Sequence, residues 1–205
     1  NGCKSAIKNI VVTVRPPIVA SATASPICEE QIATLMAGGS GGMGNYTYRW
    51  LHNNSTNQLQ NILLVSDSTF TVVGSDGCST NDSASVKVTV HPKPAPAFTS
   101  TPGGCVPYPI TFTENSTIKT GSIVAWEWKF GDNGTSNVQN PVYLYNNAGS
   151  WNVTLTVTSA LGCKASITDS GKAVIFPNPE AAFTPDPVET SILTPNIKFI
   201  DQSTS

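Results

Sequence analysis

The sequence is short of charge. Only 12% of its 205 residues are Asp, Glu, Lys or Arg, and the net charge is −2. So few basic residues are not expected to form the positive face that nucleic acids or anionic lipids require. No apolar run approaches the roughly 20 residues of a membrane helix. The sequence therefore predicts no nucleic-acid partner and no membrane insertion.

Side chains suited to catalysis are also scarce. The chain has two histidines, His52 and His91, and no Ser-His-Asp set or carboxylate pair stands out. Residues 39–44 (GSGGMG) match the glycine pattern of a dinucleotide site, but a strand-like segment follows where that site needs a helix N-terminus. We predict that the chain is not an enzyme and binds no cofactor.

The composition favours short strands. Ser, Thr, Asn, Gly and Pro are abundant, and apolar residues occupy alternate positions in segments such as 151–157. This period of two is typical of a strand with one buried face. About seven such strands per domain, with turn residues between them, predict all-β, immunoglobulin-like sandwiches without a helix.

A cysteine, a strand and a proline exit recur three times. The copies run from Cys3 to Pro16, from Cys78 to Pro92 and from Cys163 to Pro177. A period of this length is the size of a small sandwich domain. We therefore expect a head-to-tail string joined by semi-rigid Pro-rich spacers. Its parts are the C-terminal strand of a preceding domain (1–15), two complete domains (18–91 and 97–176) and the start of a further domain (180–205).

The second domain resembles the PKD domain family. The resemblance is carried by residues 126–134 (WEWKFGDNG), 140–145 (NPVYLY) and 149–157 (GSWNVTLTV). The family pattern is roughly W-x-F-G-D-G, N-P-x-x-x-Y and G-x-Y-x-V-x-L-x-V, from which Asn133 and Trp151 depart. Residues 181–205 are consistent with the opening of another copy.

The first domain is similar, more loosely, to PKD-like or Ig-like repeats of very large surface proteins of gliding bacteria. That resemblance implies a gliding-motility, adhesin-like protein exported by type IX secretion, in which these domains form a stalk or a surface filament.

Asp132 is a weak metal candidate. Its turn could offer carboxylate and carbonyl oxygens to calcium, but one carboxylate is a poor shell for an ion that takes six to eight oxygens. We predict a tight turn and no metal.

Three tryptophans could form a sugar-binding platform. Trp126, Trp128 and Trp151 alternate with polar residues, which places them on one strand face. In the family that the domain resembles, these positions fill the sandwich interior, so we predict core residues.

Two serines are candidate modification sites. Ser68 and Ser83 follow aspartates in Asp-Ser pairs that resemble the O-glycosylation sites of gliding bacteria. The alternative is that both are ordinary turn residues.

Five cysteines at repeated positions favour an oxidising, extracellular location. One pairing joins Cys28 to Cys78 and Cys105 to Cys163 within each domain. Sandwich topology argues against it, because these cysteines would lie a strand length apart, about 23 Å, whereas bridged Cα atoms lie within about 7 Å.

The other pairing joins Cys28 to Cys163 between domains. It leaves Cys3 and Cys78 for upstream partners and Cys105 for a downstream one. Both pairings remain open, as do free thiols.

These features predict an extracellular structural repeat segment, the stalk of a large bacterial cell-surface adhesin or a surface filament, that displays a distal binding element. The expected partners are neighbouring repeats, identical chains or surface glycans. The alternatives are a glycan-binding module and accessory domains of a secreted hydrolase.

Overall fold

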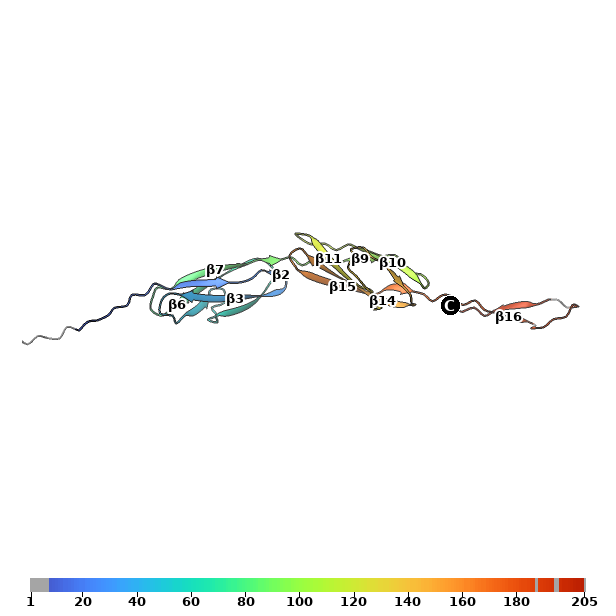
Figure 1. Ribbon diagram of the computed structural model, residues 1–205, viewed down its shortest axis with the longest axis horizontal. Coiled ribbons are helices and arrows are strands. Elements are labelled where there is room, and N and C mark those ends of the chain that lie inside the picture. Colours follow the sequence, from blue (N-terminus) through green and yellow to red (C-terminus); the bar gives the residue numbers. More distant parts are fainter. Residues whose placement is uncertain (1–7, 187, 194–195, 205) are drawn as a thin grey trace, which may run out of the picture. The chain divides into compact units, whose positions relative to one another are not determined.

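The computed structural model describes residues 8–186, 188–193 and 196–204. The chain divides into two compact units, residues 1–92 and 93–205, which are described separately below (Figure 1). Every regular element in the described residues is a β-strand, so the predicted all-β, immunoglobulin-like class is confirmed. The described residues contain no helix with the length and apolar character needed to cross a membrane.

The first unit contains a sandwich of eight strands, domain 1. The strands are β1 (Val19–Thr23), β2 (Ile27–Cys28), β3 (Gln31–Ser40), β4 (Thr47–Trp50), β5 (Leu59–Leu64), β6 (Ser68–Ser75), β7 (Asp82–Val88) and β8 (Val90–His91). One sheet has the order β1-β3-β5 and the other β4-β6-β7, and both are antiparallel. The short strands β2 and β8 pair in parallel.

The core of domain 1 lies between these two sheets. Along β3, Ala33, Leu35 and Ala37 are fully buried, while the residues between them are exposed. The opposite sheet contributes Trp50 and Val72, also fully buried. The period of two in the sequence thus becomes an inner apolar face and an outer face on each sheet.

The second unit contains domain 2, built from seven strands. These are β9 (Phe98–Ser100), β10 (Tyr108–Glu114), β11 (Ile123–Lys129), β12 (Thr135–Ser136), β13 (Val142–Tyr145), β14 (Gly149–Ser159) and β15 (Lys164–Ile175). The sheet orders are β13-β10-β9 and β12-β11-β14-β15. Six strands repeat the arrangement of domain 1, with β3 matching β10, β4 matching β11 and β6 matching β14, while β12 has no counterpart there.

The core of domain 2 is rich in aromatic rings. Phe112, Trp128, Phe130 and Tyr145 are fully buried, together with the alternating Val153, Leu155 and Val157 of β14. Trp128 lies 5.5 Å from Phe112 and 5.2 Å from Phe98, measured between ring centroids. Large rings in edge-to-face and tilted contact bury much apolar area in a small domain.

The second unit also contains a lone hairpin. Its strands are β16 (Phe183–Asp186) and β17 (Lys198–Asp201), which pair in antiparallel register. An isolated bridge between Glu180 and Thr204 extends the pairing. We call residues 180–204 the C-terminal hairpin.

The strand expected in residues 1–15 is not formed in the part that the structure describes, residues 8–15. These residues are exposed, and no other described segment pairs with them. A strand needs a hydrogen-bonded neighbour, so an alternating sequence alone does not produce one. Residues 1–7, which include Cys3, lie outside the described residues.

Candidate functional site

The aromatic motif of domain 2 forms a tight turn after β11. The N–H of Phe130 donates to the carbonyl of Gly134 at 3.0 Å, and Gly131 and Asn133 adopt φ values of 94° and 77°. A Cβ at position 131 would lie 2.8 Å from the carbonyl oxygen of Asn152. The turn therefore needs glycine at 131 and tolerates asparagine at 133.

The Asp132 carboxylate is engaged within this turn. Its Oδ1 accepts from the Gly134 N–H at 3.1 Å, and the Tyr143 hydroxyl lies 2.9 and 3.0 Å from Oδ1 and Oδ2. Burial, and then the hydrogen bond to Asp132, raise the pKa of Tyr143. Asp132 orders the turn, and the prediction that it holds no calcium stands as a prediction. Among the described residues, no three His, Cys, Asp or Glu side chains come together as metal ligands would.

The three tryptophans of domain 2 differ in burial and in their position along the sandwich. Trp128 is fully buried, and its indole N–H donates to the Val138 carbonyl at 3.0 Å. Trp126 and Trp151 are half-buried and pack against the same core. Trp126 pairs with Val157 and Trp151 with Ala173, so the two lie toward opposite ends of β14. The three rings do not form one exposed platform.

One organising residue was missed in the sequence. Asp76 is buried in the β6–β7 loop, where its carboxylate accepts from the N–H groups of Ser79 (2.8 Å), Cys78 (3.1 Å) and Met43 (2.9 Å). These bonds hold the pKa of Asp76 far below its usual range, with the Ser79 bond the largest cause. The turn sequence Asp76-Gly77 was visible, but its partner at Met43 is 33 residues away.

The glycine-rich segment 39–44 lies on the other side of this contact. It ends β3 and turns toward β4, with positive φ at Gly41, Gly42 and Gly44. A Cβ on Gly42 would collide with the Asp76 carboxylate. The glycines serve close packing of this loop, and a strand follows them.

The two candidate glycosylation serines differ in exposure. Ser68 begins β6, is half-buried, and donates to the Ser66 carbonyl at 3.2 Å. Ser83 lies exposed on β7. The preceding aspartates are both engaged, since Asp67 accepts from the Val90 N–H and Asp82 from the Ala20 N–H, each at 2.8 Å. Modification of either serine stays a prediction, with Ser83 the more accessible.

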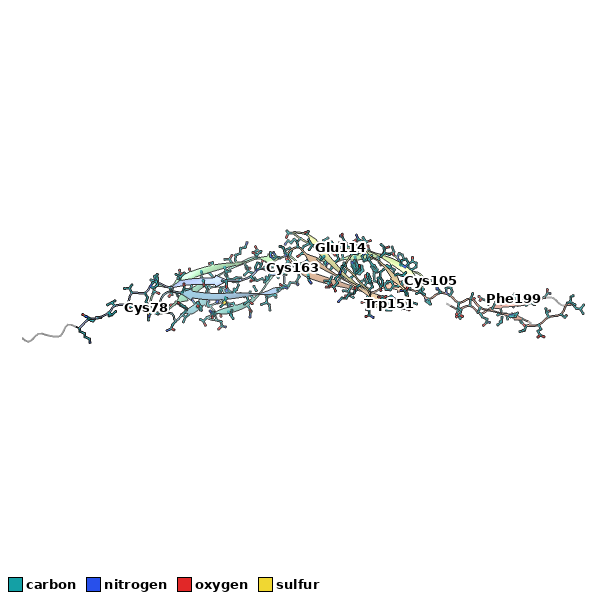
Figure 2. All side chains as sticks on the ribbon, in the orientation of Figure 1. Cys78, Cys105, Glu114, Trp151, Cys163 and Phe199 are labelled. Carbon is teal, nitrogen blue, oxygen red and sulfur yellow. The ribbon has the colours of Figure 1, made fainter. Side chains whose placement is uncertain are left out.

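The two cysteines of domain 2 lie at opposite ends of the sandwich (Figure 2). Cys105 forms a parallel bridge with Phe176, where the chain leaves the domain. Cys163 lies in the β14–β15 turn, where its carbonyl accepts from the Ser159 N–H at 2.8 Å. The 12 residues of β15 separate these ends, which at strand spacing corresponds to roughly 40 Å.

Domain 1 places its cysteines in the same way. Cys28 pairs in parallel with His91 in the β2–β8 pair, immediately before the proline exit. Cys78 lies at the other end, in the β6–β7 loop ordered by Asp76. Each domain therefore carries one cysteine at its exit end and one at its entry end.

Each domain has one disulfide-bonded and one free cysteine among these four. Cys28 and Cys163 are each disulfide-bonded, whereas Cys78 and Cys105 carry free thiols and are exposed. The alternative that joined Cys28 to Cys78 and Cys105 to Cys163 is therefore wrong. Its physical obstacle is the length of the strands, because bridged Cα atoms must lie within about 7 Å.

Comparison with known proteins identifies part of the chain. Residues 91–175 match the sequence model of the PKD domain. A stretch of 76 residues, 37% of this chain, is 40% identical to a microbial collagenase of Vibrio alginolyticus, of which it spans 9%.

Two solved structures are also similar. The PKD1 domain of the Vibrio cholerae metalloprotease PrtV is 30% identical, with 40% of this chain and 98% of that chain covered and a TM-score of 0.37. A structure from a bacterial ice-binding adhesin is 11% identical, with 81% and 67% covered and a TM-score of 0.40.

The sandwich of domain 2, its Trp128 core and its ordered Gly131–Gly134 turn agree with the family match. PKD domains are non-catalytic modules of extracellular or secreted proteins, a location that the disulfide-bonded cysteines also fit. Residues 91–175 of this chain are a PKD domain.

Proposed function

We propose that this chain is a structural repeat segment of an extracellular surface protein, a stalk that spaces and displays a distal binding element. The observation that carries the proposal is the placement of the cysteines, one at the entry end and one at the exit end of each sandwich. A bond within a domain stabilises that domain alone. Cysteines at the two ends suit bonds from each domain to the next.

We further propose that Cys28 and Cys163 bond to each other across the Pro-rich spacer. Both are disulfide-bonded, and Cys78 and Cys105 are free. Cys3 could supply a partner to one of the two bonded cysteines but not to both. Under this pairing the spacer, residues 92–96, is closed into a covalent loop and does not act as a free hinge.

Peptide mapping of the non-reduced, full-length chain tests the pairing. We expect one linked peptide pair containing Cys28 and Cys163, which reduction separates. The variant Cys28→Ser should lose the linked pair, and the matched variant Cys78→Ser should keep it. A linked peptide containing Cys28 and Cys78 would contradict the proposal.

Small-angle scattering tests the mechanical consequence. The oxidised chain should give a narrow distribution of maximum dimensions, and reduction should broaden it while both thermal unfolding transitions persist. Cys163→Ser should behave like the reduced protein without any reductant. Identical distributions before and after reduction would show that the disulfide does not limit bending.

The resemblance of domain 1 to repeats of gliding bacteria supports a finer proposal. The segment would belong to a large adhesin or filament on the cell surface that is exported by type IX secretion. Identical chains or surface glycans would be its further partners. This assignment predicts that protease added to intact cells cleaves the segment. Protection of the segment until the cells are lysed would argue against a surface location. In this proposal the full-length protein uses the segment for spacing and display and not for catalysis.

The second candidate function is an accessory region of a secreted hydrolase. It is favoured by one observation, the 40% identity over 76 residues to the Vibrio alginolyticus collagenase. The complete reading frame distinguishes the two candidates, since a hydrolase domain in the same polypeptide would favour this second function. Further domains of the same cysteine pattern would favour the stalk.

A further inference from the structure

The C-terminal hairpin presents an apolar face without a covering sheet among the described residues. Phe183 and Phe199 are 66% and 62% exposed, although their rings lie 5.2 Å apart in an edge-on contact. They line an open hollow of about 440 Å³ with Ala181, Ala182, Asp201 and Ser203. Figure 2 shows Phe199 on this hairpin. Two large exposed rings on one small hairpin indicate a surface that is buried in its functional state.

The backbone of the hairpin repeats the hydrogen bonds of β9 and β10. In domain 2 the Asn115 N–H donates to the Ala97 carbonyl at 2.8 Å, and in the hairpin the Gln202 N–H donates to the Ala182 carbonyl at 2.8 Å. Beyond this pair, Ala95 and Thr117 exchange two backbone bonds, of 2.7 and 3.0 Å. Glu180 and Thr204 exchange two bonds as well, of 2.9 and 3.0 Å.

The side-chain contacts repeat too. The Ser116 hydroxyl accepts from the Ala97 N–H at 3.1 Å, and the Ser203 hydroxyl accepts from the Ala182 N–H at 3.3 Å. The N–H of each serine donates to the carboxylate two residues earlier, Glu114 at 2.6 Å and Asp201 at 2.8 Å. Agreement at this level goes beyond what any two antiparallel strands would share.

Domain 2 shows what such a hairpin packs against. The residues of β9 and β10 that match Phe183 and Phe199 are Phe98 and Phe112. Phe98 is half-buried and Phe112 fully buried, and both rings contact Trp128 on the opposite sheet. Phe112 also lies 5.3 Å from Phe130. The matching ring pair is covered by a sheet in domain 2 and exposed in the C-terminal hairpin.

We propose that the C-terminal hairpin is the opening half-sandwich of a further PKD domain, and that its Phe183–Phe199 face docks a four-stranded sheet of the β12-β11-β14-β15 type. The occupant carries a Trp-x-Phe pair that fills the hollow as Trp128 and Phe130 fill domain 2. This inference depends on the internal likeness of the two hairpins and not on the stalk proposal, so disulfide mapping and the test below fail independently.

The test is a transplant within the full-length chain. Residues 95–117 are replaced by a second copy of residues 180–204, and unfolding of domain 2 is followed by calorimetry. The transplant keeps a phenylalanine at both ring positions. We therefore expect domain 2 to keep a cooperative unfolding transition, with a melting temperature lowered by about 10 °C or less.

Two control variants make the outcome decisive. The transplant with Phe183→Ala and Phe199→Ala should lose the transition of domain 2, since two core rings are removed. The native segment 95–117 with two glycines inserted between its strands matches the longer loop of the hairpin, and we expect it to fold.

Two results would overturn the proposal. One is that the variant with two inserted glycines folds while the transplant of residues 180–204 does not. The other is a transplant whose stability does not change when both phenylalanines become alanine, because the docking face would then not be the apolar one.

Discussion

Domains 1 and 2 bury one tryptophan in the same way and surround it differently. Trp50 and Trp128 are both fully buried, and each indole N–H donates to a backbone carbonyl at 3.0 Å, that of Asn57 and of Val138. Around Trp50 the facing strand β3 contributes Ala33, Leu35 and Ala37, whereas in domain 2 eight other aromatic residues lie in or against the core. The anchored tryptophan is common to both sandwiches, whereas domain 2 has the larger ring cluster; in domain 1 the ring of His52 lies 6.1 Å from Trp50 and 4.9 Å from Phe70.

The strand beside the tryptophan shows the same contrast. In domain 2, Tyr145 on β13 donates its hydroxyl to the Phe130 carbonyl at 2.9 Å. In domain 1, the matching strand β5 carries Gln60, whose buried amide donates to the Ser55 hydroxyl at 2.8 Å and to the Asn57 carbonyl at 3.1 Å. In both domains a buried polar side chain of this strand satisfies a backbone carbonyl in the loop that follows the tryptophan strand.

The largest expected effect comes from the shared tryptophan. Trp128→Ala should destabilise domain 2 by about 3–5 kcal/mol, because a large buried ring is replaced by a cavity. Trp50→Ala should cost domain 1 a similar amount. Calorimetry of the full-length chain should show one transition shifted in each variant and the other unchanged. Trp128→Phe is the milder control, and near-wild-type stability of Trp128→Ala would mean that the core tolerates the cavity.

A smaller effect is expected from the tyrosine that only domain 2 has. Tyr145→Phe removes the hydroxyl that satisfies the buried Phe130 carbonyl, which should cost about 1–3 kcal/mol. Tyr143→Phe is the matched control, because its ring is half-buried and its partner Asp132 keeps the Gly134 N–H. Equal losses in the two variants would show that burial of the Tyr145 bond is unimportant. Neither substitution should move the transition of domain 1.

Much of this architecture could be predicted from the sequence. Alternation in segments such as 151–157 gave the strands and their buried faces, because a side-chain period of two leaves few options. The repeated Cys-strand-Pro pattern indicated that each domain has its cysteines at opposite ends. These features depend on local sequence and on a known topology.

The features that were missed depend on long-range contacts. The bond between Asp76 and Met43 and the Gln60 network of domain 1 each join residues whose meeting depends on the folded loops. Trp126 and Trp151 share the inward face with Trp128, as predicted, yet both are half-buried because they lie toward the ends of the sandwich. Strand periodicity gives the face of a residue but not its depth.

Acid should destabilise domain 1 more than domain 2, because no described carboxyl group of domain 2 has its pKa lowered as strongly as that of Asp76. Three backbone N–H groups lower its pKa in the folded state. A carboxyl group whose pKa is lower in the folded than in the unfolded state stabilises the protein at pH values above its unfolded-state pKa, about 4. This contribution is lost as the pH falls below that value. Domain 1 should therefore lose stability below about pH 4.

The variant Asp76→Asn isolates this contribution. It should weaken domain 1 at neutral pH and flatten the dependence of its melting temperature on pH in the acid range, with the transition of domain 2 as the internal reference. An unchanged acid slope in Asp76→Asn would assign the effect to other carboxyl groups of domain 1.

The smallest expected effect is that of calcium on the turn after the tryptophan strand. In domain 1 this turn is built with amides, and Asn54 adopts φ 57° while its N–H donates to the Trp50 carbonyl at 2.9 Å. In domain 2 the turn carries Asp132, whose oxygens already accept from Tyr143 and Gly134. A single engaged carboxylate is a poor ligand set for an ion that takes six to eight oxygens. Millimolar calcium should therefore leave both melting temperatures unchanged, since a ligand stabilises only a state that binds it. A rise of several degrees in domain 2 that Asp132→Asn abolishes would show instead that the turn is a calcium site, and would make this turn the clearest functional difference between the two domains.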